Sequence, residues 1–61
     1  MKPGDLVKYS DTFVKGYGSK VESLIGIISR FDEDDDPIVF WLRENREEAN
    51  FRSHIKVISE Y

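Results

Sequence analysis

The chain has 61 residues, of which 34% are charged and 39% are hydrophobic, and its net charge at pH 7 is −3. A chain this short buries only about 60% of its unfolded surface, so we expect one small domain spanning residues 1–61. The absence of cysteine excludes disulfides and thiolate sites, and a single histidine excludes a His-rich zinc site.

No apolar run reaches the ~20 residues that a membrane-spanning helix needs. The opening Met-Lys-Pro-Gly-Asp lacks the apolar core of a signal peptide. Residues 1–30 carry a net charge of +2, whereas residues 31–61 carry nine acidic against four basic side chains. An acidic protein has no general attraction for nucleic-acid phosphates. We therefore expect a cytoplasmic protein that does not contact membranes, and nucleic acid is an improbable partner.

The first half of the chain predicts two strands joined by a long loop. Turn residues precede a run of β-formers at residues 6–9. Residues 10–23 are read as a loop, because they are polar and two glycines flank Tyr17. Residues 24–31 are short and rich in β-branched side chains, which favours a strand over a helix. Gly26 within this strand indicates a bend or a bulge.

The second half predicts three further strands. Pro37 cannot donate to a ladder and therefore suits the start of a strand, which we expect at residues 38–43. Two further strands are expected at residues 49–52 and 56–59. A polar turn at residues 44–47 and a single helical turn at 53–55 separate them. A helix over residues 41–51 is the alternative, since most of these residues have good helix propensity. The apolar residues there do not recur at helical spacing, which favours the strands.

Alternation along the third strand puts Val39 and Trp41 on one face and Phe40 on the other. Bulk is needed inside a small barrel, so Trp41 is placed inward. The predicted core consists of the following residues: Val7, Leu24, Ile25, Ile27, Val39, Trp41, Phe51, Ile55 and Val57.

Five short strands with one long first loop are typical of a small antiparallel barrel that is closed or half closed. The order of Gly-Asp-Leu-Val-Lys-Tyr, Ile-Gly-Ile-Ile, Val-Phe-Trp and His-Ile-Lys-Val-Ile resembles the Src-homology-3-like barrel. The fold class is therefore all-β: a five-stranded Src-homology-3-like barrel with a long first loop and a short helical turn before the last strand.

The opening Met-Lys-Pro-Gly-Asp-Leu-Val and the closing Ile-Lys-Val-Ile are similar to those of short barrel proteins of tailed bacteriophages, cyanophages included. This resemblance covers nearly the whole chain and marks the fold much more than the function. It implies a phage-encoded protein acting in the host cytoplasm. The Ala-Leu-Tyr-Asp-Tyr and Pro-Ser-Asn-Tyr signatures of polyproline-binding relatives are missing, which argues against polyproline ligands. Relatives that bind RNA use basic loops, whereas residues 32–36 are all acidic.

Two segments are candidate partner-binding surfaces. If the first loop folds over the barrel, aromatic side chains in or beside it can form a groove with Phe40. The simpler alternative is that Phe13 and Tyr9 cap the open end of the barrel. The acid run is the second candidate, as a docking loop for a basic partner, although the pattern favours a solvated turn that repels aggregation. The predicted partner-binding residues are Tyr9, Phe13, Tyr17, Asp34, Asp35, Asp36 and Phe40.

Neither catalysis nor a metal centre is predicted. His54 has no sequence context that indicates a triad, which is a spatial arrangement with an orienting carboxylate. Asp32, Asp34 and Asp36 match the first three ligand positions of a helix-loop-helix calcium site. The match fails at Pro37, where a glycine is needed, and at Arg43, where a bidentate glutamate is needed. Loose binding of calcium or magnesium stays open, and no cofactor is expected.

These observations favour a non-enzymatic protein–protein interaction module that binds a host or phage protein as a monomer or weak homo-oligomer. One alternative is a nucleic-acid or nucleoprotein accessory factor that uses Lys8, Lys15 and Lys20 near the first loop. The other is a small structural component of the virion that works as a homo-oligomer.

Overall fold

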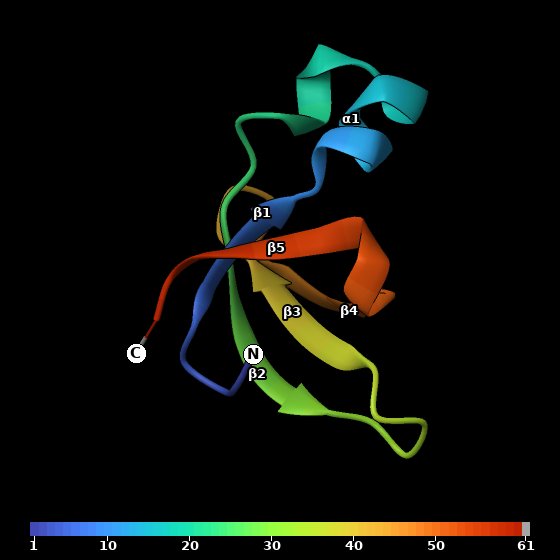
Figure 1. Cartoon of the computed structure of the whole chain (residues 1–61). Helices are drawn as coiled ribbons and strands as arrows, with labels where there is room; N and C mark the ends of the chain where they lie inside the picture. The colour runs from blue at the N-terminus through green and yellow to red at the C-terminus, as the bar shows by residue number, and fades with distance from the viewer. Residues whose placement is uncertain (61) are drawn as a thin grey trace.

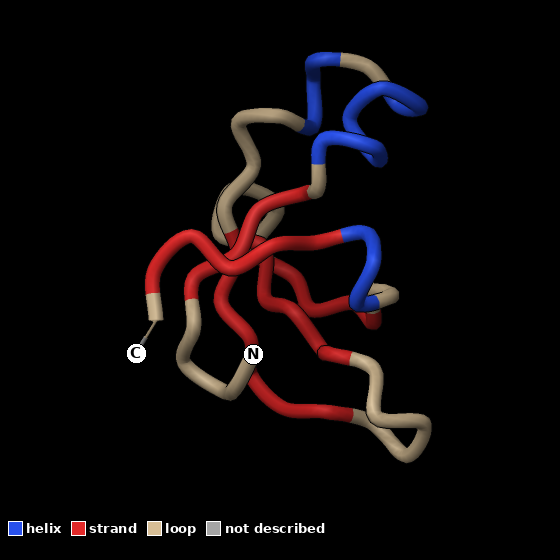
Figure 2. Tube along the Cα trace, in the orientation of Figure 1, coloured by secondary structure: helices blue, strands red, loops and turns tan. Residues whose placement is uncertain are grey.

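A computed structural model describes residues 1–60. Five antiparallel strands form one sheet in the order β4-β3-β2-β1-β5. One α-helix and two single turns of 3-10 helix (η1, η2) lie between them (Figures 1 and 2). The elements in chain order are β1 (Leu6–Tyr9), α1 (Asp11–Tyr17), η1 (Ser19–Val21), β2 (Gly26–Phe31), β3 (Pro37–Trp41), β4 (Arg46–Ala49), η2 (Arg52–His54) and β5 (Ile55–Ser59).

The expected five-stranded antiparallel architecture is confirmed, and the first strand lies where the sequence places it. Closure into a barrel is not confirmed, because among residues 1–60 β4 and β5 are the two edges of an open sheet. The register shifts between Leu6 and Val7 and between Ile28 and Arg30. Such bulges increase the twist of a sheet, and β1 and β5 cross over β2 and β3 in Figure 1.

The first loop is the largest departure from the expectation. Residues 10–23 contain α1 and η1, which stand above the sheet in Figure 1. Ser10 caps α1, since its Oγ accepts a hydrogen bond from the amide of Phe13 at 3.3 Å. Gly18 ends the helix with φ of 96°, a conformation that favours glycine. Gly18 is one of the two glycines that favour a loop in the sequence, and in the structure it terminates a short helix.

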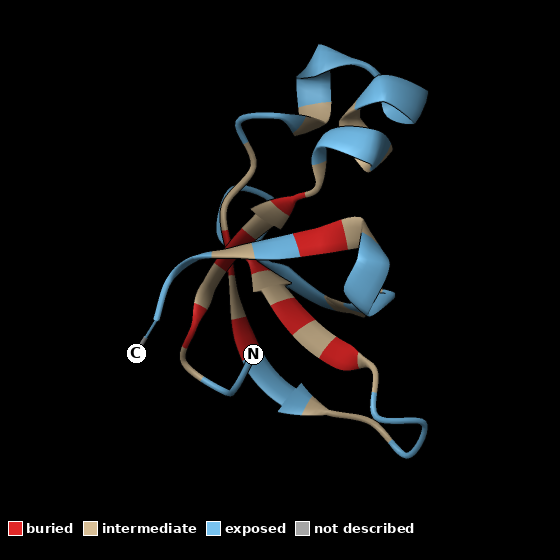
Figure 3. Ribbon diagram, in the orientation of Figure 1, coloured by how far each residue is buried: buried red, intermediate tan, exposed pale blue. Residues whose placement is uncertain are grey.

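The core consists of Val7, Tyr9, Ile28, Val39, Trp41 and Ile55. Figure 3 shows the buried segments on β1, β2, β3 and β5. The predictions for Val7, Val39, Trp41 and Ile55 are confirmed, and Leu24 and Val57 pack against this core.

Three core predictions are wrong. Phe51 is 62% exposed, while Ile25 and Ile27 are half-buried and Ile28 is buried in their place. The inward-facing residues of β2 are Gly26 and Ile28, so the predicted register was off by one residue, which exchanges the two faces of a strand.

Gly26 explains the register of β2. A Cβ atom at this position would lie 2.9 Å from Cε3 of Trp41 and would also collide with Cγ1 of Val39. The glycine therefore makes room for the indole ring directly across the sheet, where Gly26 pairs with Trp41. The bulge that the sequence suggests at Gly26 lies instead between Ile28 and Arg30.

The fourth strand is shifted relative to the prediction. β4 covers Arg46–Ala49, and the turn before it occupies residues 42–45 rather than 44–47. Asn45 adopts a φ of 53° in that turn, which asparagine tolerates better than most residues. An edge strand accepts charged residues because it faces water. Arg30 donates to both carboxylate oxygens of Glu47 and holds the pKa of that carboxyl below its usual value.

Candidate functional site

Four aromatic rings form a continuous stack from the core to the surface. Trp41 stacks on Tyr9 with ring centroids 4.4 Å apart, and Tyr9 stacks on Phe13 at 4.3 Å. Phe13 in turn stacks on Tyr17, again at 4.3 Å. The indole of Trp41 is 1% exposed, whereas Tyr17 is 71% exposed. The stack depends on α1, because residues four apart on a helix lie on the same face.

A second group of rings continues from Phe13 toward η2. The imidazole of His54 lies 4.8 Å from the Phe13 ring, in a tilted arrangement, and Phe51 meets His54 edge-on at 5.2 Å. We define the aromatic surface as Phe13, Tyr17, Phe51 and His54. Phe51 and Tyr17 are its exposed members.

A depression lies between α1 and η2 within the aromatic surface, and we call it the hollow. Its volume is about 540 Å³. Its lining comprises Thr12, Phe13, Gly16, Tyr17, Ser53 and His54. The lining contains no carboxylate and no lysine or arginine, so the hollow combines aromatic faces with hydroxyl groups.

Two contacts hold α1 beside η2 and so shape the hollow. The amide of Ser10 donates to the carbonyl of His54 at 2.8 Å. At the same end of the helix, Lys56 in β5 forms an ion pair with Asp11 at 3.2 Å. The backbone bond positions the helix, since exposed ion pairs contribute little on their own.

The structure does not assemble the predicted groove as one surface. Tyr9 is buried, and its hydroxyl donates to Glu48 at 3.2 Å. Burial is the main reason that the pKa of Tyr9 is raised above its ordinary value. Phe40 is half-buried on the face of β3 opposite Trp41, as predicted, and so it points away from this stack. Only Phe13 and Tyr17 of the four predicted aromatics belong to the aromatic surface.

Sequence reasoning missed Phe51 and His54. It places Phe51 in the core and assigns His54 a structural or surface role with no part in binding. The available signal was the setting of Phe51, between Asn50 and Arg52 and beside the expected helical turn. A ring in such a polar setting is a candidate for the surface.

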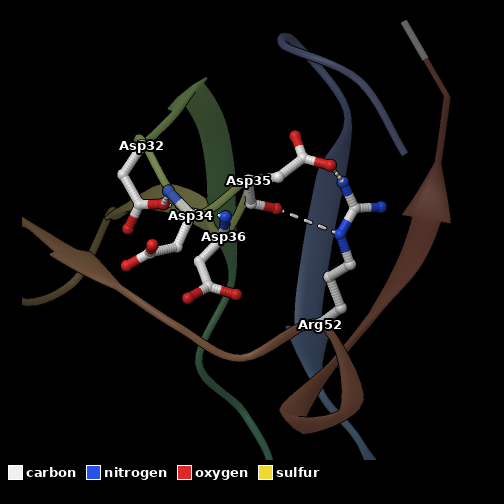
Figure 4. Close-up of polar contacts among 5 residues, drawn as sticks. All are labelled: Asp32, Asp34, Asp35, Asp36 and Arg52. Carbon is white, nitrogen blue, oxygen red and sulfur yellow. Dashed lines mark hydrogen bonds and ion pairs between the residues drawn. The ribbon is translucent and has the colours of Figure 1, made fainter.

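The acid run at residues 32–36 forms the turn between β2 and β3, and we call it the acid loop (Figure 4). Asp32 organises it: its Oδ1 accepts hydrogen bonds from the amides of Asp34 and Asp36, both at 2.9 Å. Such side-chain caps are typical of aspartate in turns. Asp35 has a φ of 65° at the tip of the turn.

Arg52 connects the acid loop to the aromatic surface. Its Nη2 lies 2.8 Å from Oδ2 of Asp35, and its Nε donates to the Asp35 carbonyl at 3.1 Å (Figure 4). The guanidinium also lies 5.1 Å from the centre of the Phe31 ring. Since Arg52 begins η2 directly after Phe51, the acid loop and the aromatic surface are neighbours.

The acid loop retains a large negative charge. Asp35 is its only side chain with an ion pair in the described part of the chain, so the carboxylates of Glu33, Asp34 and Asp36 are available to a partner. Carboxylate oxygens of Asp32, Asp34 and Asp36 lie within 4.8 Å of one another. An exposed acidic group of this kind is common without a metal ion, and one Asp32 oxygen already serves the turn.

The three lysines considered for nucleic acid stand on three different elements. Lys8 lies on β1, Lys15 on α1 and Lys20 on η1. None of them forms an ion pair with another residue of the range 1–60.

Comparisons with family models, curated proteins and solved structures found no match. Within residues 1–60, no helix has the length and apolar character needed to cross a membrane.

Proposed function

We propose that this protein is a non-enzymatic module that binds another protein through the aromatic surface and the acid loop. The observation that carries this proposal is the pair of exposed rings, Tyr17 and Phe51, which ring contacts through Phe13 and His54 connect beside the hollow. Contiguous exposed apolar surface is typical of interaction sites, and contacts through Phe13 and His54 join the two rings into one surface. Aromatic residues are also enriched among the few residues that dominate binding energy.

The proposed fold is a half-closed Src-homology-3-like barrel of the kind found in small phage proteins. The strand order β4-β3-β2-β1-β5 and the 3-10 turn η2 directly before β5 support it. In this proposal the partner is a host or phage protein, and the binding site lies between α1 and η2.

The acid loop gives the proposed interaction its electrostatic component. Glu33, Asp34 and Asp36 present charge that is not neutralised within the described residues. Charges at the rim of an interface mainly increase the association rate with an oppositely charged partner. We therefore propose that the partner has a basic segment that reaches the acid loop while an apolar part contacts the aromatic surface.

Binding of single-stranded nucleic acid is the second candidate function. Tyr17 ends the ring stack with an exposed face, and Lys15 and Lys20 are close to it in the chain. Bases stack on exposed aromatic rings, and lysines neutralise phosphates. The acid loop and the net charge of −3 favour the protein partner. A salt-dependent affinity for a single-stranded oligonucleotide, lost in Tyr17→Ala, would favour nucleic acid instead.

The proposed function is tested with a partner identified by affinity capture and then purified. We expect Tyr17→Ala or Phe51→Ala to weaken its binding by about 30-fold or more, which corresponds to a hot spot of about 2 kcal/mol. Leu42→Ala is the matched control, because Leu42 is an exposed apolar residue in the turn between β3 and β4. Equal weakening in all three variants, or none in the aromatic pair, would exclude the proposed surface.

A further inference from the structure

Gly16 has no role in the fold that would require glycine. It lies inside α1, and its φ is outside the positive range that L-residues avoid. A Cβ atom built on it meets no atom within 4 Å. Glycine in a helix is less favourable than alanine by roughly 1 kcal/mol, so this position weakens a helix of only 7 residues. Gly26 and Gly18 differ, since the first avoids a collision and the second ends the helix.

The space beside Gly16 belongs to the hollow. Gly16 lines it together with Phe13 and Tyr17 from the same helix and with Ser53 and His54 from η2. A side chain at position 16 would project into this open space, so glycine is the residue that leaves the most room there. The absence of a Cβ also lets a ligand approach the helix backbone closely.

The chemistry of the lining indicates the kind of group that fits. Ring faces of Phe13 and Tyr17 offer stacking surface, and the hydroxyls of Thr12 and Ser53 offer hydrogen bonds. No carboxylate lines the hollow, so a lysine or arginine head group buried there would lose water without gaining a counter-charge. The complementary group is an uncharged ring with a polar edge.

The charge next to the hollow indicates which residues should flank that ring in the partner. Arg52 connects η2 to the acid loop, where the carboxylates of Asp32, Glu33, Asp34 and Asp36 have no ion pair within residues 1–60. A segment that places a ring in the hollow and extends past η2 is therefore attracted if it carries lysine or arginine.

We propose that the hollow is an anchor pocket for one tryptophan or tyrosine side chain from a basic segment of the partner, and that Gly16 keeps this pocket open. This proposal rests on the proposed function, since it assumes that the aromatic surface binds a protein. It assigns Gly16 as the residue that determines the size of the accepted group.

Capped pentapeptides titrated into the full chain test the ligand chemistry, with amide chemical shifts as the readout. The probe is Gly-Trp-Gly-Lys-Lys, compared with Gly-Leu-Gly-Lys-Lys and Gly-Trp-Gly-Glu-Glu. We expect saturable shifts at residues 12–17 and 51–54 with the first peptide. Binding should be about tenfold weaker or worse with each of the others, a loss of about 1.4 kcal/mol. Equal binding of the leucine peptide, or no saturable shift with any peptide, would overturn the proposal.

Gly16→Leu tests the role of the glycine, and Lys15→Leu is its control. Both add the same good helix former to α1, but position 15 does not line the hollow. We expect Gly16→Leu to be at least as stable as the wild type and to bind Gly-Trp-Gly-Lys-Lys at least tenfold more weakly. Lys15→Leu should bind it as the wild type does. Wild-type affinity in a folded Gly16→Leu variant would contradict the assignment.

Failure of this inference can be separated from failure of the proposed function. If no peptide binds but Tyr17→Ala still weakens the purified partner, the anchor pocket is wrong and the interaction surface stands. If Tyr17→Ala and Phe51→Ala leave partner binding unchanged, the proposed function itself fails. Shifts of residues 12–17 and 51–54 with adenosine monophosphate, and not with the tryptophan peptide, would identify a base-binding site and overturn the inference.

Discussion

The indole of Trp41 and the phenol of Tyr9 lie face to face, with ring centroids 4.4 Å apart and planes inclined by 14°. Both rings are buried, and each has a polar partner: the indole Nε1 donates to Oδ1 of Asn50 at 3.3 Å and the Tyr9 hydroxyl donates to Glu48. Because Phe13 stacks on the other side of Tyr9, the position of α1 depends on how the core packs.

Trp41→Ala should remove about 3–5 kcal/mol of unfolding free energy, the usual cost of deleting a large buried aromatic side chain. A domain of this size has little more than that in total. Urea unfolding followed by circular dichroism measures the loss. Tyr17→Ala is the control from the exposed end of the same stack and should cost less than about 1 kcal/mol. Similar losses in the two variants would contradict the burial of Trp41.

Alanine should have opposite effects at two glycines. Gly26→Ala is expected to destabilise the protein by about 1–3 kcal/mol, because its Cβ would lie 2.9 Å from the Trp41 ring. Gly16→Ala is expected to stabilise it by roughly 0.5–1 kcal/mol, since nothing lies within 4 Å of the new Cβ. Thermal melts of both variants check the signs. A stabilised Gly26→Ala would mean that β2 and β3 pack less closely than described.

Asp32 should be the residue of the acid loop that matters most for stability. Asp32→Ala removes the acceptor of two backbone hydrogen bonds, and we expect a loss of about 1–2 kcal/mol. Asp32→Asn keeps an oxygen in the same place and should retain most of that stability. Asp34→Asn should leave stability unchanged or slightly higher, because it relieves repulsion among neighbouring carboxylates. Chemical denaturation of the three variants tests this order.

Stability should fall at alkaline pH through Tyr9. Burial raises the pKa of its hydroxyl above the ordinary value of 10.0, so the folded protein holds this proton more tightly than the unfolded chain does. The resulting stabilisation is fully present below the unfolded pKa and is lost as the pH rises through the folded pKa.

Unfolding free energies measured between about pH 8 and pH 11 test this linkage. Tyr9→Phe is the control, since it keeps the stacked ring and removes the titrating hydroxyl. Its stability should decline less over the same range. An equally steep decline in Tyr9→Phe would assign the alkaline loss to other groups.

The sequence predicts the strands well where local chemistry and burial agree. Residues 6–9 combine β-formers with alternating burial, and Pro37 starts β3 as its missing amide hydrogen suggests. β4 is harder to locate, because its Arg-Glu-Glu-Ala residues have good helix propensity and only their place at a sheet edge makes them a strand. α1 is missed because Gly16 lowers the helix propensity of a segment of only 7 residues.

The candidate site is predicted in part for the same reasons. Phe13 and Tyr17 are identifiable as aromatic residues in a polar segment, and the acid loop is plain in the sequence. Their arrangement in space cannot be predicted from the sequence, since it depends on the helical spacing of residues 13 and 17 and on the contact of Phe13 with His54. Alternation places Tyr9 on the inward face of its strand with Val7, but its burial under Phe13 depends on the position of α1.

Composition and alternation are local properties, and they are enough to predict a small, acidic, largely β protein with Trp41 in its core. The inward face of β2 depends on packing between strands, since only the approach of Trp41 to Gly26 selects Ile28 over Ile27. Such packing also decides where the aromatic surface lies. Phe13 and His54 are far apart in the chain, and the backbone bond from Ser10 to His54 brings their elements together. Contacts between distant residues have no local signature, so packing alone created the hollow.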